Sequence, residues 1–566
     1  MLAAAPHRGT EHSILMLGHC ALGVAINPTL PRARLARHGD LLCAVVGEID
    51  NSGDVEGVSD PADPTAVAVG AFRSHGELFA AALRGTFVVA ISDGKRVWCA
   101  RDHFGFGPLF YRSGPEGFFA ASEAKQVIAG AGLKPEPDLE VVEAILFGTY
   151  DDDTPSALKG VRRLPKTTVL RAEEGHTSTL RYWDPEAWLE TGRYDGKGLQ
   201  EAFDHFMNLA VGRVLTGSDV VSLSGGIDAP AIAAYAAPIY PSRFGRPLPA
   251  LSMVFPNSPR VDERRYIEIV TRALGMDLNT YELSGSGAGD PAYWARLLDG
   301  PTPTLAIAEV KENLERAASL GYRTVLMGDI AEFLFDMNRY VVQHLLQRAR
   351  FAPAVRHLAS QMRVGGTAAG VVRQLAGTMA PRAIQGLYLR RSVREWRRFP
   401  EWVDATRVTI GEASSVVPAR QRWRRLQLGA FYGPGLTSEA ESICQALCAV
   451  RVRRPFADVD LWQFFLSLPA ETKFPDSGRK TLVRRLLRGR VPDEILDRTD
   501  KTYFNDSILQ RVDYPTLSAW LARPEVEIPG FDYAKLGAKL ENRSLDIADY
   551  MWAKDLAMAH AFLSQW

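Results

Sequence analysis

The sequence predicts a two-domain protein in which a β-rich α+β domain precedes an α/β domain with a parallel sheet. Short strand-like segments fill the first third of the chain, and strands alternate with helices from about Gly198 onward. Such alternation is typical of a parallel sheet with helical crossovers. The chain has 566 residues, which is enough for two domains. We place the boundary after "RYWDPEAW" (Arg181–Trp188), so that the domains comprise residues 1–190 and 191–566.

The composition argues against several classes of protein. Lys+Arg and Asp+Glu both total 66, so the formal net charge is zero. A chain balanced in this way has no electrostatic preference for nucleic acid or for a membrane surface. No apolar run reaches the roughly 18 residues that a membrane span needs, and the N-terminus lacks the layout of a signal peptide. We therefore expect a cytoplasmic protein that binds neither nucleic acid nor a membrane.

The strands of the first domain are predicted from apolar segments and from one turn. "LLCAVVGEI" (Leu41–Ile49) reads as a strand, and "TFVVAIS" and "KRVWCAR" flank Asp93-Gly94, a strong hairpin signal. "EGFFAASE" is predicted to form a further short strand. These segments together predict a β-rich domain.

Strands and helices are predicted in alternation in the second domain. The strands are "DVVSLS", "PALSMVF", "NTYELS" and "YRTVLMG", and the helices are Ala229–Ala237, Asp262–Leu274 and Ile307–Leu320. Asp262 and Glu263 at the start of one helix and Gly275 after its end follow the rules for helix termini. In parallel sheets, ligands bind at the carboxyl ends of the strands, where we expect Ser224–Asp228 and Gly328–Glu332 to lie.

The stretch "VVSLSGGIDAPAIAAYAA" (Val220–Ala237) combines a strand, a glycine turn and a helix. Ser224, Gly225 and Gly226 break the apolar run, and Pro230 fits the first helical turn. Such a turn directs backbone N–H groups and a positive helix end at one point, which suits a phosphate, and an aspartate there suits Mg²⁺. On its own, the stretch is better explained as an ordinary strand-to-helix turn.

A second candidate is "VLMGDIAEFLF" (Val325–Phe335), where a buried strand leads into Gly328 and then into an acidic turn. Asp329 and Glu332 are three residues apart and can share one helix face. With Asp228 they would bring three carboxylates to one sheet edge, which suits a Mg²⁺ that bridges nucleotide phosphates. Taken alone, these acids are better explained as helix caps.

Together, the two stretches resemble the ATP-dependent asparagine synthetase family. "LSGGIDAP" is similar to the family's LSGGLDSS pyrophosphate loop, and "LMGDIAEFLF" is similar to its LSGEGADELF. The resemblance continues through "VFPNSPRVDERRYIEIVTRALG", "VRRPFADVDLWQFFLSLP", "GRKTLVRRLLRGRVPDEILDRTDKTYF", "VGEIDN", "LRGTFVVAISDGKRVWCARDHFGFGPLFY" and "FFAASEAKQVI". It implies an N-terminal Ntn-hydrolase-like, class II glutaminase-like sandwich domain. It also implies a C-terminal ATP-pyrophosphatase domain of the adenine nucleotide α-hydrolase-like kind, which forms amides with ATP and Mg²⁺.

The same resemblance implies roles for individual residues. Asp228 and Glu332 would bind Mg²⁺, and Asp329 and Lys501 would be catalytic. For Lys501 the reason is that a lysine can stabilise developing phosphate and oxyanion charge. The alternative for Lys501 is a surface lysine on a loop. The residues expected to bind the nucleotide are Ser222, Leu223, Ser224, Gly225, Gly226, Ile227, Asp228, Val254 and Gly328.

Some positions depart from the family's pattern. Glu332 stands where the family has Asp, Ala229 replaces a serine, and Ile330 replaces a glycine. Ala229 therefore lacks a hydroxyl that would contact a phosphate. Arg479 and Lys480 are weaker candidates for the site.

The first domain has lost the residues that the resemblance assigns to glutamine hydrolysis. The family's nucleophile is a terminal cysteine, whereas a leucine follows Met1 here, and Cys20 falls inside the segment similar to LGHRRLSIiD. Ala21 replaces the arginine that grips glutamine, Val46 replaces the oxyanion-hole asparagine, and Arg84 replaces an acid. Glu48 remains. We expect a foldable domain with a scaffold or substrate-docking role.

An enzyme that activates a carboxylate without making ammonia needs an amine on its own substrate, and such an arrangement gains from proximity. β-Lactam synthetases and lasso peptide macrolactam cyclases work in this way. Asp329 matches neither the Glu of asparagine synthetases nor the Tyr of β-lactam synthetases. The long Arg-rich helical segment after Val341 favours a lasso cyclase, which holds a folded peptide.

We therefore expect a precursor core peptide as substrate, and a leader peptidase and a leader-recognition protein as partners. The alternatives are a β-lactam synthetase-like or other small-molecule amide synthetase, a glutamine-independent asparagine synthetase, and a pseudoenzyme scaffold.

Overall fold

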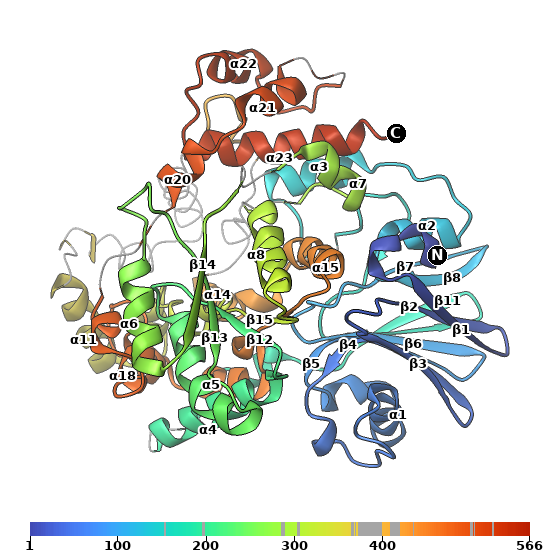
Figure 1. Ribbon diagram of the computed structural model, residues 1–566, viewed down its shortest axis with the longest axis horizontal. Coiled ribbons are helices and arrows are strands. Elements are labelled where there is room, and N and C mark those ends of the chain that lie inside the picture. The colour runs from blue at the N-terminus through green and yellow to red at the C-terminus, as the bar shows by residue number, and fades with distance from the viewer. Residues whose placement is uncertain are drawn as a thin grey trace.

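The computed structural model has a β-rich domain packed against a domain with a parallel sheet (Figure 1), which confirms the predicted fold class. It describes residues 1–566 except 152–153, 195–197, 285–288, 303–305, 364–366, 368–369, 372–398, 408–418, 434, 499–501, 503, 523 and 525. We call residues 1–190 the first domain and residues 191–566 the second domain.

A six-stranded antiparallel sheet in the order β11-β10-β6-β5-β4-β3 forms the centre of the first domain. Smaller sheets, β1-β2 and β8-β7-β9, lie beside it. The predicted hairpin at Asp93-Gly94 joins β5 to β6. The strands are β1 (Glu11–Leu17), β2 (Cys20–Ile26), β3 (Ala33–His38), β4 (Leu41–Ile49), β5 (Gly85–Ser92), β6 (Arg96–Arg101), β7 (Phe110–Gly114), β8 (Gly117–Ala121), β9 (Arg162–Arg163), β10 (Thr168–Glu173) and β11 (His176–Arg181).

The six-stranded sheet buries side chains on both faces because alternate residues of a strand point to opposite sides. Leu41, Cys43 and Val45 of β4 belong to the core that includes helix α1 (Pro64–His75). Leu42 and Ala44 pack on the other face with residues of β2. Two further helices of this domain are α2 (Ala124–Gly130) and α3 (Leu139–Phe147).

The second domain is built on a parallel sheet in the order β14-β13-β12-β15-β16. In the central strand, Val221 is paired with Ala250 on one side and with Leu326 on the other. The carboxyl ends of these neighbouring strands therefore meet at one edge. The strands are β12 (Asp219–Ser222), β13 (Pro249–Met253), β14 (Asp277–Tyr281), β15 (Thr324–Leu326) and β16 (Arg451–Arg453).

Helices cover both faces of this sheet. Val221 belongs to the core that includes α4 (Leu199–Val214), α5 (Asp228–Phe244) and α6 (Arg264–Leu274). Val220, its neighbour, belongs to the core that includes α8 (Ile307–Ser319) and α15 (Leu436–Cys448). A strand that is buried on both faces explains the continuous apolar run in the sequence.

Helix α5 is longer than predicted. The predicted helix ends at Ala237, but α5 continues through Pro238 and Pro241 to Phe244. Tyr240, which is fully buried, accepts a hydrogen bond from the N–H of Asp219 at 3.2 Å. Burial of this ring offsets the hydrogen bonds that the prolines remove, and Gly245 ends the helix with a φ of 70°.

The remaining helices surround the sheet, and α20 to α23 form a layer above it (Figure 1). They are α7 (Pro291–Leu297), α9 (Ala331–Phe335), α10 (Val341–Gln347), α11 (Phe351–Arg363), α14 (Ala419–Gln427), α16 (Val459–Ser467), α17 (Ala470–Lys473), α18 (Thr481–Leu486), α19 (Asp493–Leu496), α20 (Asn505–Gln510), α21 (Tyr514–Leu521), α22 (Tyr533–Glu541) and α23 (Ile547–Leu563). Short 3₁₀-helices are η1 (Leu2–Ala4), η2 (Pro6–Arg8), η3 (Ser52–Asp54), η4 (Gly76–Ala82), η5 (Pro185–Trp188), η6 (Gly429–Phe431) and η7 (Pro455–Ala457).

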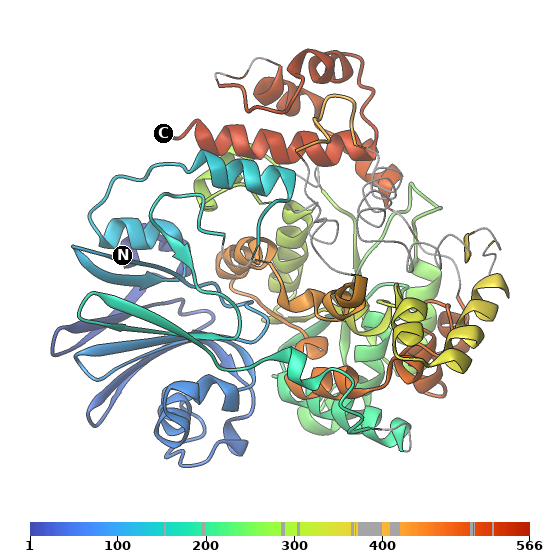
Figure 2. The same cartoon turned by 180° about the vertical axis from the view of Figure 1, so that it is seen from behind.

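The two domains share a hydrophobic core at the top of the molecule. Figure 2 shows α3 of the first domain running beneath α23, the last helix of the chain. Val142 and Ile145 of α3 pack in one cluster with Ala553 and Leu556 of α23. Within the described ranges, no helix is long and apolar enough to cross a membrane.

Candidate functional site

The glycine turn lies at the carboxyl end of β12 and leads directly into α5. Ser222 ends the strand, and the N–H of Leu223 donates to the carbonyl oxygen of Leu251 at 3.0 Å. Leu223 and Ile227 are buried and anchor the turn, whereas Ser224 and Gly226 are exposed. The outer side of the turn and the N-terminus of α5 are therefore available to an anion.

Gly225, at the centre of this turn, is held by side chains from two distant segments. Its N–H donates to Oε2 of Glu263 at 3.0 Å, and its carbonyl oxygen accepts from Nη1 of Arg498 at 2.8 Å. Arg498 also donates to Oε1 of Glu263 at 2.8 Å. A Cβ on Gly225 would lie 3.0 Å from both side chains, so a glycine is needed here. The Glu263 carboxylate therefore already accepts the Gly225 N–H, and a phosphate would be bound by the exposed residues of the turn.

The second turn lies beside the first, at the carboxyl end of β15. A Cβ on Gly328 would lie 2.8 Å from the backbone nitrogen of Ala229, so the absence of a side chain lets the two turns touch. Ile330, where the resemblance expects glycine, has a φ of 63°. This left-handed conformation is strained for a β-branched residue. The strain lies between the two acids of the turn, Asp329 and Glu332.

An ammonium group pairs with the Asp228 carboxylate where the turns touch, and the charges of Asp228 and Asp329 act on Glu332. Nζ of Lys480 lies 2.6 and 2.5 Å from the two oxygens of Asp228. Displacement of water from the Glu332 carboxyl raises its pKa, and the negative charges of Asp228 and Asp329 raise it further against the effect of Lys480. The site thus concentrates negative charge that a further cation would stabilise.

These residues fit Mg²⁺ and ATP. Asp228 and Glu332 supply the hard carboxylate oxygens that Mg²⁺ prefers, and Mg²⁺ typically takes one or two protein carboxylates together with substrate phosphates. Among the residues that the structure describes, no group of three or more potential metal ligands is found, so a bound nucleotide would complete the coordination. When bound, the metal would neutralise charge on the phosphate groups.

Asp329 is oriented by a buried arginine at the end of the neighbouring strand β16. Nε of Arg454, which follows β16 directly, donates to Oδ2 of Asp329 at 2.6 Å. Arg454 also donates to Glu441, and its side chain is only 6% exposed, whereas Asp329 is 46% exposed. Asp329 therefore presents a fixed carboxylate to the solvent side of the sheet edge.

The other predicted residues have different positions. Val254 follows β13, is buried, and donates its N–H to the carbonyl oxygen of Tyr281 at 2.9 Å. Arg479 pairs with Asp336 and does not contribute to the contacts at Asp228 described above. Lys501 lies outside the described residues, so its role stays a prediction.

Sequence reasoning missed the side chains that arrive from distant segments. Glu263 was assigned to the start of a helix, yet its carboxylate reaches the glycine turn. The sequence does not identify Arg454 as a site residue. It gives Lys480 only as a weaker candidate than Lys501, although Lys480 contacts Asp228. Unlike a local motif, a contact between distant segments leaves no spacing signal in one sequence.

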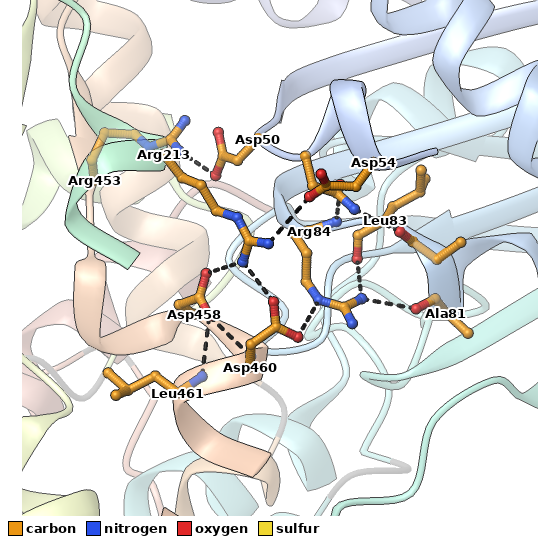
Figure 3. Close-up of polar contacts among 12 residues, drawn as sticks. Asp50, Asp54, Ala81, Leu83, Arg84, Arg213, Arg453, Asp458, Asp460 and Leu461 are labelled. Carbon is orange, nitrogen blue, oxygen red and sulfur yellow. Dashed lines mark hydrogen bonds and ion pairs between the residues drawn. The ribbon is translucent and has the colours of Figure 1, made fainter. Parts of the chain in front are cut away.

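Arg84, which stands where the resemblance expects an acid, and Asp50 form ion pairs between the domains (Figure 3). Arg84 donates from Nε to Oδ1 of Asp460 at 3.1 Å, and Arg213 donates to the other oxygen of Asp460 at 2.6 Å. Asp50 is paired with Arg453. Each first-domain residue of this group therefore binds a partner in the second domain.

Glu48, the one acid that remains, is also engaged. Arg32 donates to both of its oxygens, at 2.8 and 2.9 Å. Burial alone would raise the pKa of Glu48, but the charges of Arg32, Arg453 and Arg451 hold it below its ordinary value. Val46 lies inside β4, where it is paired with Val88. Both oxygens of the one remaining acid are therefore already engaged by an arginine of the same domain.

The fold and the site define an ATP-dependent amide-forming ligase with a modified glutaminase-like domain. The comparisons with known proteins agree: residues 210–537 match the family model described as asparagine synthase, and residues 55–183 match the model of a glutamine amidotransferase domain. The chain belongs to the asparagine synthase family.

Individual relatives are distant. Asparagine synthetase [glutamine-hydrolyzing] 3 of Bacillus subtilis (strain 168) is 24% identical over 439 residues, which is 74% of this chain and 67% of that protein. A Mycobacterium bovis protein, provisionally described as a glutamine-hydrolyzing asparagine synthetase, is 23% identical over 500 residues, 82% of this chain and 72% of its own length. The glutamine PRPP amidotransferase structure from B. subtilis aligns with a TM-score of 0.25 and 12% identity over 58% of this chain and 87% of that chain.

Proposed function

We propose that this chain is a lasso peptide cyclase. It would use ATP and Mg²⁺ to join the side-chain carboxylate of an Asp or Glu in a core peptide to the N-terminal amine of the same peptide. The carboxylate attacks the α-phosphorus of ATP and releases pyrophosphate. The amine then attacks the activated carbonyl carbon, loses a proton and expels AMP as the macrolactam forms.

The observation that carries this proposal is the state of the first domain. Glu48 and Arg84, the charged residues at its glutaminase-like positions, are engaged in ion pairs rather than open to a substrate, and so is Asp50 nearby. Without glutamine hydrolysis the enzyme has no internal source of ammonia. An amine that belongs to the substrate removes this need, and holding both groups in one site gives a large effective concentration.

The described residues suggest separate roles in phosphate binding, metal binding and orientation of the reacting groups. The exposed outer side of Ser224–Gly226 would bind phosphate groups, while Asp228 and Glu332 hold the metal. Asp329, fixed by Arg454, is placed to orient the reacting groups. Lys501 is proposed to stabilise charge on the carbonyl oxygen and the leaving phosphate.

A peptide substrate is supported by the surface of α11. Phe351, Val355 and Met362 are 63%, 62% and 46% exposed. Their spacing places them near one face of this helix, and exposed apolar side chains suit a peptide better than a small polar amino acid. A leader peptidase and a leader-recognition protein would deliver the peptide.

The experiment is to look for a short precursor peptide encoded beside the gene and, with that peptide, to reconstitute the reaction. The enzyme, the leader peptidase, the leader-recognition protein, ATP and Mg²⁺ should give a product lighter than the linear core peptide by one water. AMP and pyrophosphate should form in equal amounts. A core peptide whose acceptor Asp or Glu is replaced by Asn or Gln is the matched control and should stay linear.

Two other products would identify the alternatives. Asparagine formed from aspartate and ammonia would favour a glutamine-independent asparagine synthetase. Cyclisation of a small amino acid derivative, with no reaction of the peptide, would favour a β-lactam synthetase-like enzyme. Glutamate release from glutamine is expected in neither case, and its appearance would contradict the interpretation of the first domain.

A further inference from the structure

A continuous chain of hydrogen bonds, buried at its centre and partly buried at its ends, links the first domain to the edge of the parallel sheet. At the site end, Arg454 donates from Nε to Asp329 and from Nη2 to Oε2 of Glu441. The other oxygen of Glu441 accepts from Nε2 of Gln445 at 3.0 Å. Glu441 and Gln445 lie one turn apart on α15, so this helix carries the chain inward from the site.

The first domain completes the chain. Oε1 of Gln445 accepts from Nη1 of Arg32 at 2.8 Å, and Arg32 is fixed by its two bonds to Glu48. The path from Glu48 to Asp329 therefore has no break, and we call Arg32, Gln445, Glu441 and Arg454 the relay. Each relay residue makes at least two hydrogen bonds, so a shift at one end is transmitted to the next group.

An aromatic residue of the first domain covers the relay at its site end. The guanidinium of Arg454 lies 4.4 Å from the centre of the Phe106 ring. Phe106 is held by buried Asp102, whose carboxylate accepts from the N–H groups of Phe104, Phe106 and Gly107 at 3.0, 3.1 and 2.7 Å. The first domain thus supplies both a hydrogen-bonding and a stacking partner to one end of the site.

Adhesion between the domains does not by itself account for the relay. Buried ion pairs contribute little net stability, because desolvation offsets their attraction. The pair of Arg84 with Asp460 already joins the domains without touching Asp329. Burial raises the pKa of Glu441 despite the nearby Arg454 charge, which reflects the cost of keeping a carboxylate at this place. A role of Glu441 in orienting Arg454 would explain why the protein bears the free-energy cost of burying this carboxylate.

We propose that Arg454 is a positioning residue for Asp329, and that the first domain, through Arg32 and Phe106, forms a required half of the amide-forming site. The inference rests on the proposed role of Asp329 in the reaction. On this inference the first domain has a function that does not involve glutamine. It fixes the orientation of the Asp329 carboxylate, which the substrate would contact.

Hydrogen–deuterium exchange tests the coupling without any substrate. In Arg32→Met, the peptide that covers residues 325–335 should exchange several-fold faster than in the wild type, although Arg32 lies in the other domain. Arg84→Met is the matched control, because it breaks a domain-joining pair of similar exposure that is separate from the relay. Its exchange at 325–335 should equal that of the wild type. Unchanged exchange in Arg32→Met, or an equal rise in Arg84→Met, would overturn the inference.

A kinetic experiment separates positioning from binding. With the core peptide as substrate, Arg32→Met and Arg454→Met should lower kcat at least tenfold, with less than a twofold change in the KM for ATP. Arg454→Lys should restore only part of kcat, because one ammonium cannot reproduce two directed guanidinium bonds. An increase in KM at constant kcat would contradict a positioning role. If no variant and no wild type cyclises the peptide while the exchange result holds, the proposed substrate is wrong and the coupling between the domains stands.

Discussion

At the scale of single residues, Lys480 is the least expected feature of the site. Its ammonium contacts both oxygens of Asp228, the residue to which we assign Mg²⁺. If Asp228 holds Mg²⁺, Lys480 and the metal would compete for the same carboxylate oxygens, so the lysine would weaken the binding of free Mg²⁺.

This competition predicts that Lys480→Met binds a divalent cation more tightly than the wild type in the absence of nucleotide. A unit charge about 4 Å away contributes on the order of 4 kcal/mol at the effective dielectric of a protein surface, so at least tenfold tighter binding is expected. Mn²⁺ titration followed by electron paramagnetic resonance measures it. Arg479→Met removes the same charge beside Asp336 instead and is the control. Equal or weaker binding in Lys480→Met would contradict the assignment.

Removal of either proposed metal ligand should stop turnover. Asp228→Asn and Glu332→Gln keep the size of each side chain and remove the charge that would hold Mg²⁺, so the rate of ATP-dependent pyrophosphate release should fall by roughly 10²–10³ or more, since a metal supplies several kcal/mol of charge stabilisation. A coupled pyrophosphate assay measures the rate, and circular dichroism checks the fold. Near-normal turnover in either variant would remove that residue from the metal site.

Residues inside the two turns were predictable because glycine, acid and strand lie within one short stretch. Glu263, Arg454 and Lys480 were not, since each reaches the site from a segment distant in sequence. Their partners depend on strand order and helix placement, which periodicity does not encode.

At the scale of elements, the contact between the two turns depends on Gly328. We expect Gly328→Ala to lower the free energy of unfolding by roughly 1–3 kcal/mol, the usual cost of forcing extra atoms into a packed region. Gly226→Ala is the control, because its Cβ would have only Ser224 Oγ nearby, at 3.5 Å. Urea denaturation compares the two variants. Equal stability of both would mean that the turns do not need their close contact.

Helix α17 carries a lysine whose burial makes stability depend on pH. Lys473 is 4% exposed, donates to Oε1 of Gln427 at 2.8 Å, and has a pKa lowered to about 7 by burial. Between pH 7 and pH 10 the unfolded chain therefore binds a proton that the folded chain has lost. Stability should rise with pH across this window, by up to about 1.4 kcal/mol per unit.

Lys473→Met should remove that slope. The midpoint of urea unfolding, measured at intervals from pH 7 to pH 10, should rise less in the variant than in the wild type. Identical slopes in both proteins would show that Lys473 keeps its proton when folded. Lys539→Met is a suitable control, because its side chain is 25% exposed and the pKa of Lys539 is raised by its hydrogen bond to Asp549.

Most elements could be predicted from local pattern, and the exceptions have physical reasons. The β4 strand and the β5–β6 hairpin follow from apolar segments and one turn dipeptide. The end of α5 could not be predicted, because burial of Tyr240 overrides the local effect of Pro238. Tertiary packing decides where such a helix ends, and this packing cannot be predicted from the local pattern of one sequence.

At the scale of the whole molecule, charged side chains join the domains, and one of them is Arg84, where the resemblance expects an acid. We expect the double-mutant cycle of Arg84→Met and Asp460→Asn to give a coupling energy of roughly 0.5–3 kcal/mol, as is usual for residues in one ion-pair network. Urea denaturation of the four proteins measures it. A coupling near zero would mean that this pair does not hold the domains together.

The arrangement of the domains was the part of the fold least accessible from sequence. The motifs indicated a first domain without its former chemistry, but they gave no sign that Arg32 and Phe106 reach the other domain. Each of these contacts joins residues more than 300 positions apart, and neither belongs to a recognisable pattern.

The shared core of α3 and α23 has a consequence for how the protein is made. Val142 and Ile145 are synthesised early, whereas their partners Ala553 and Leu556 belong to the final helix of 17 residues. Until those residues have been synthesised, this cluster lacks the side chains of α23, and chains with such distant contacts fold slowly. Packing of α23 is thus a closing step for both domains, and a chain truncated before Ile547 would leave Val142 and Ile145 without these partners.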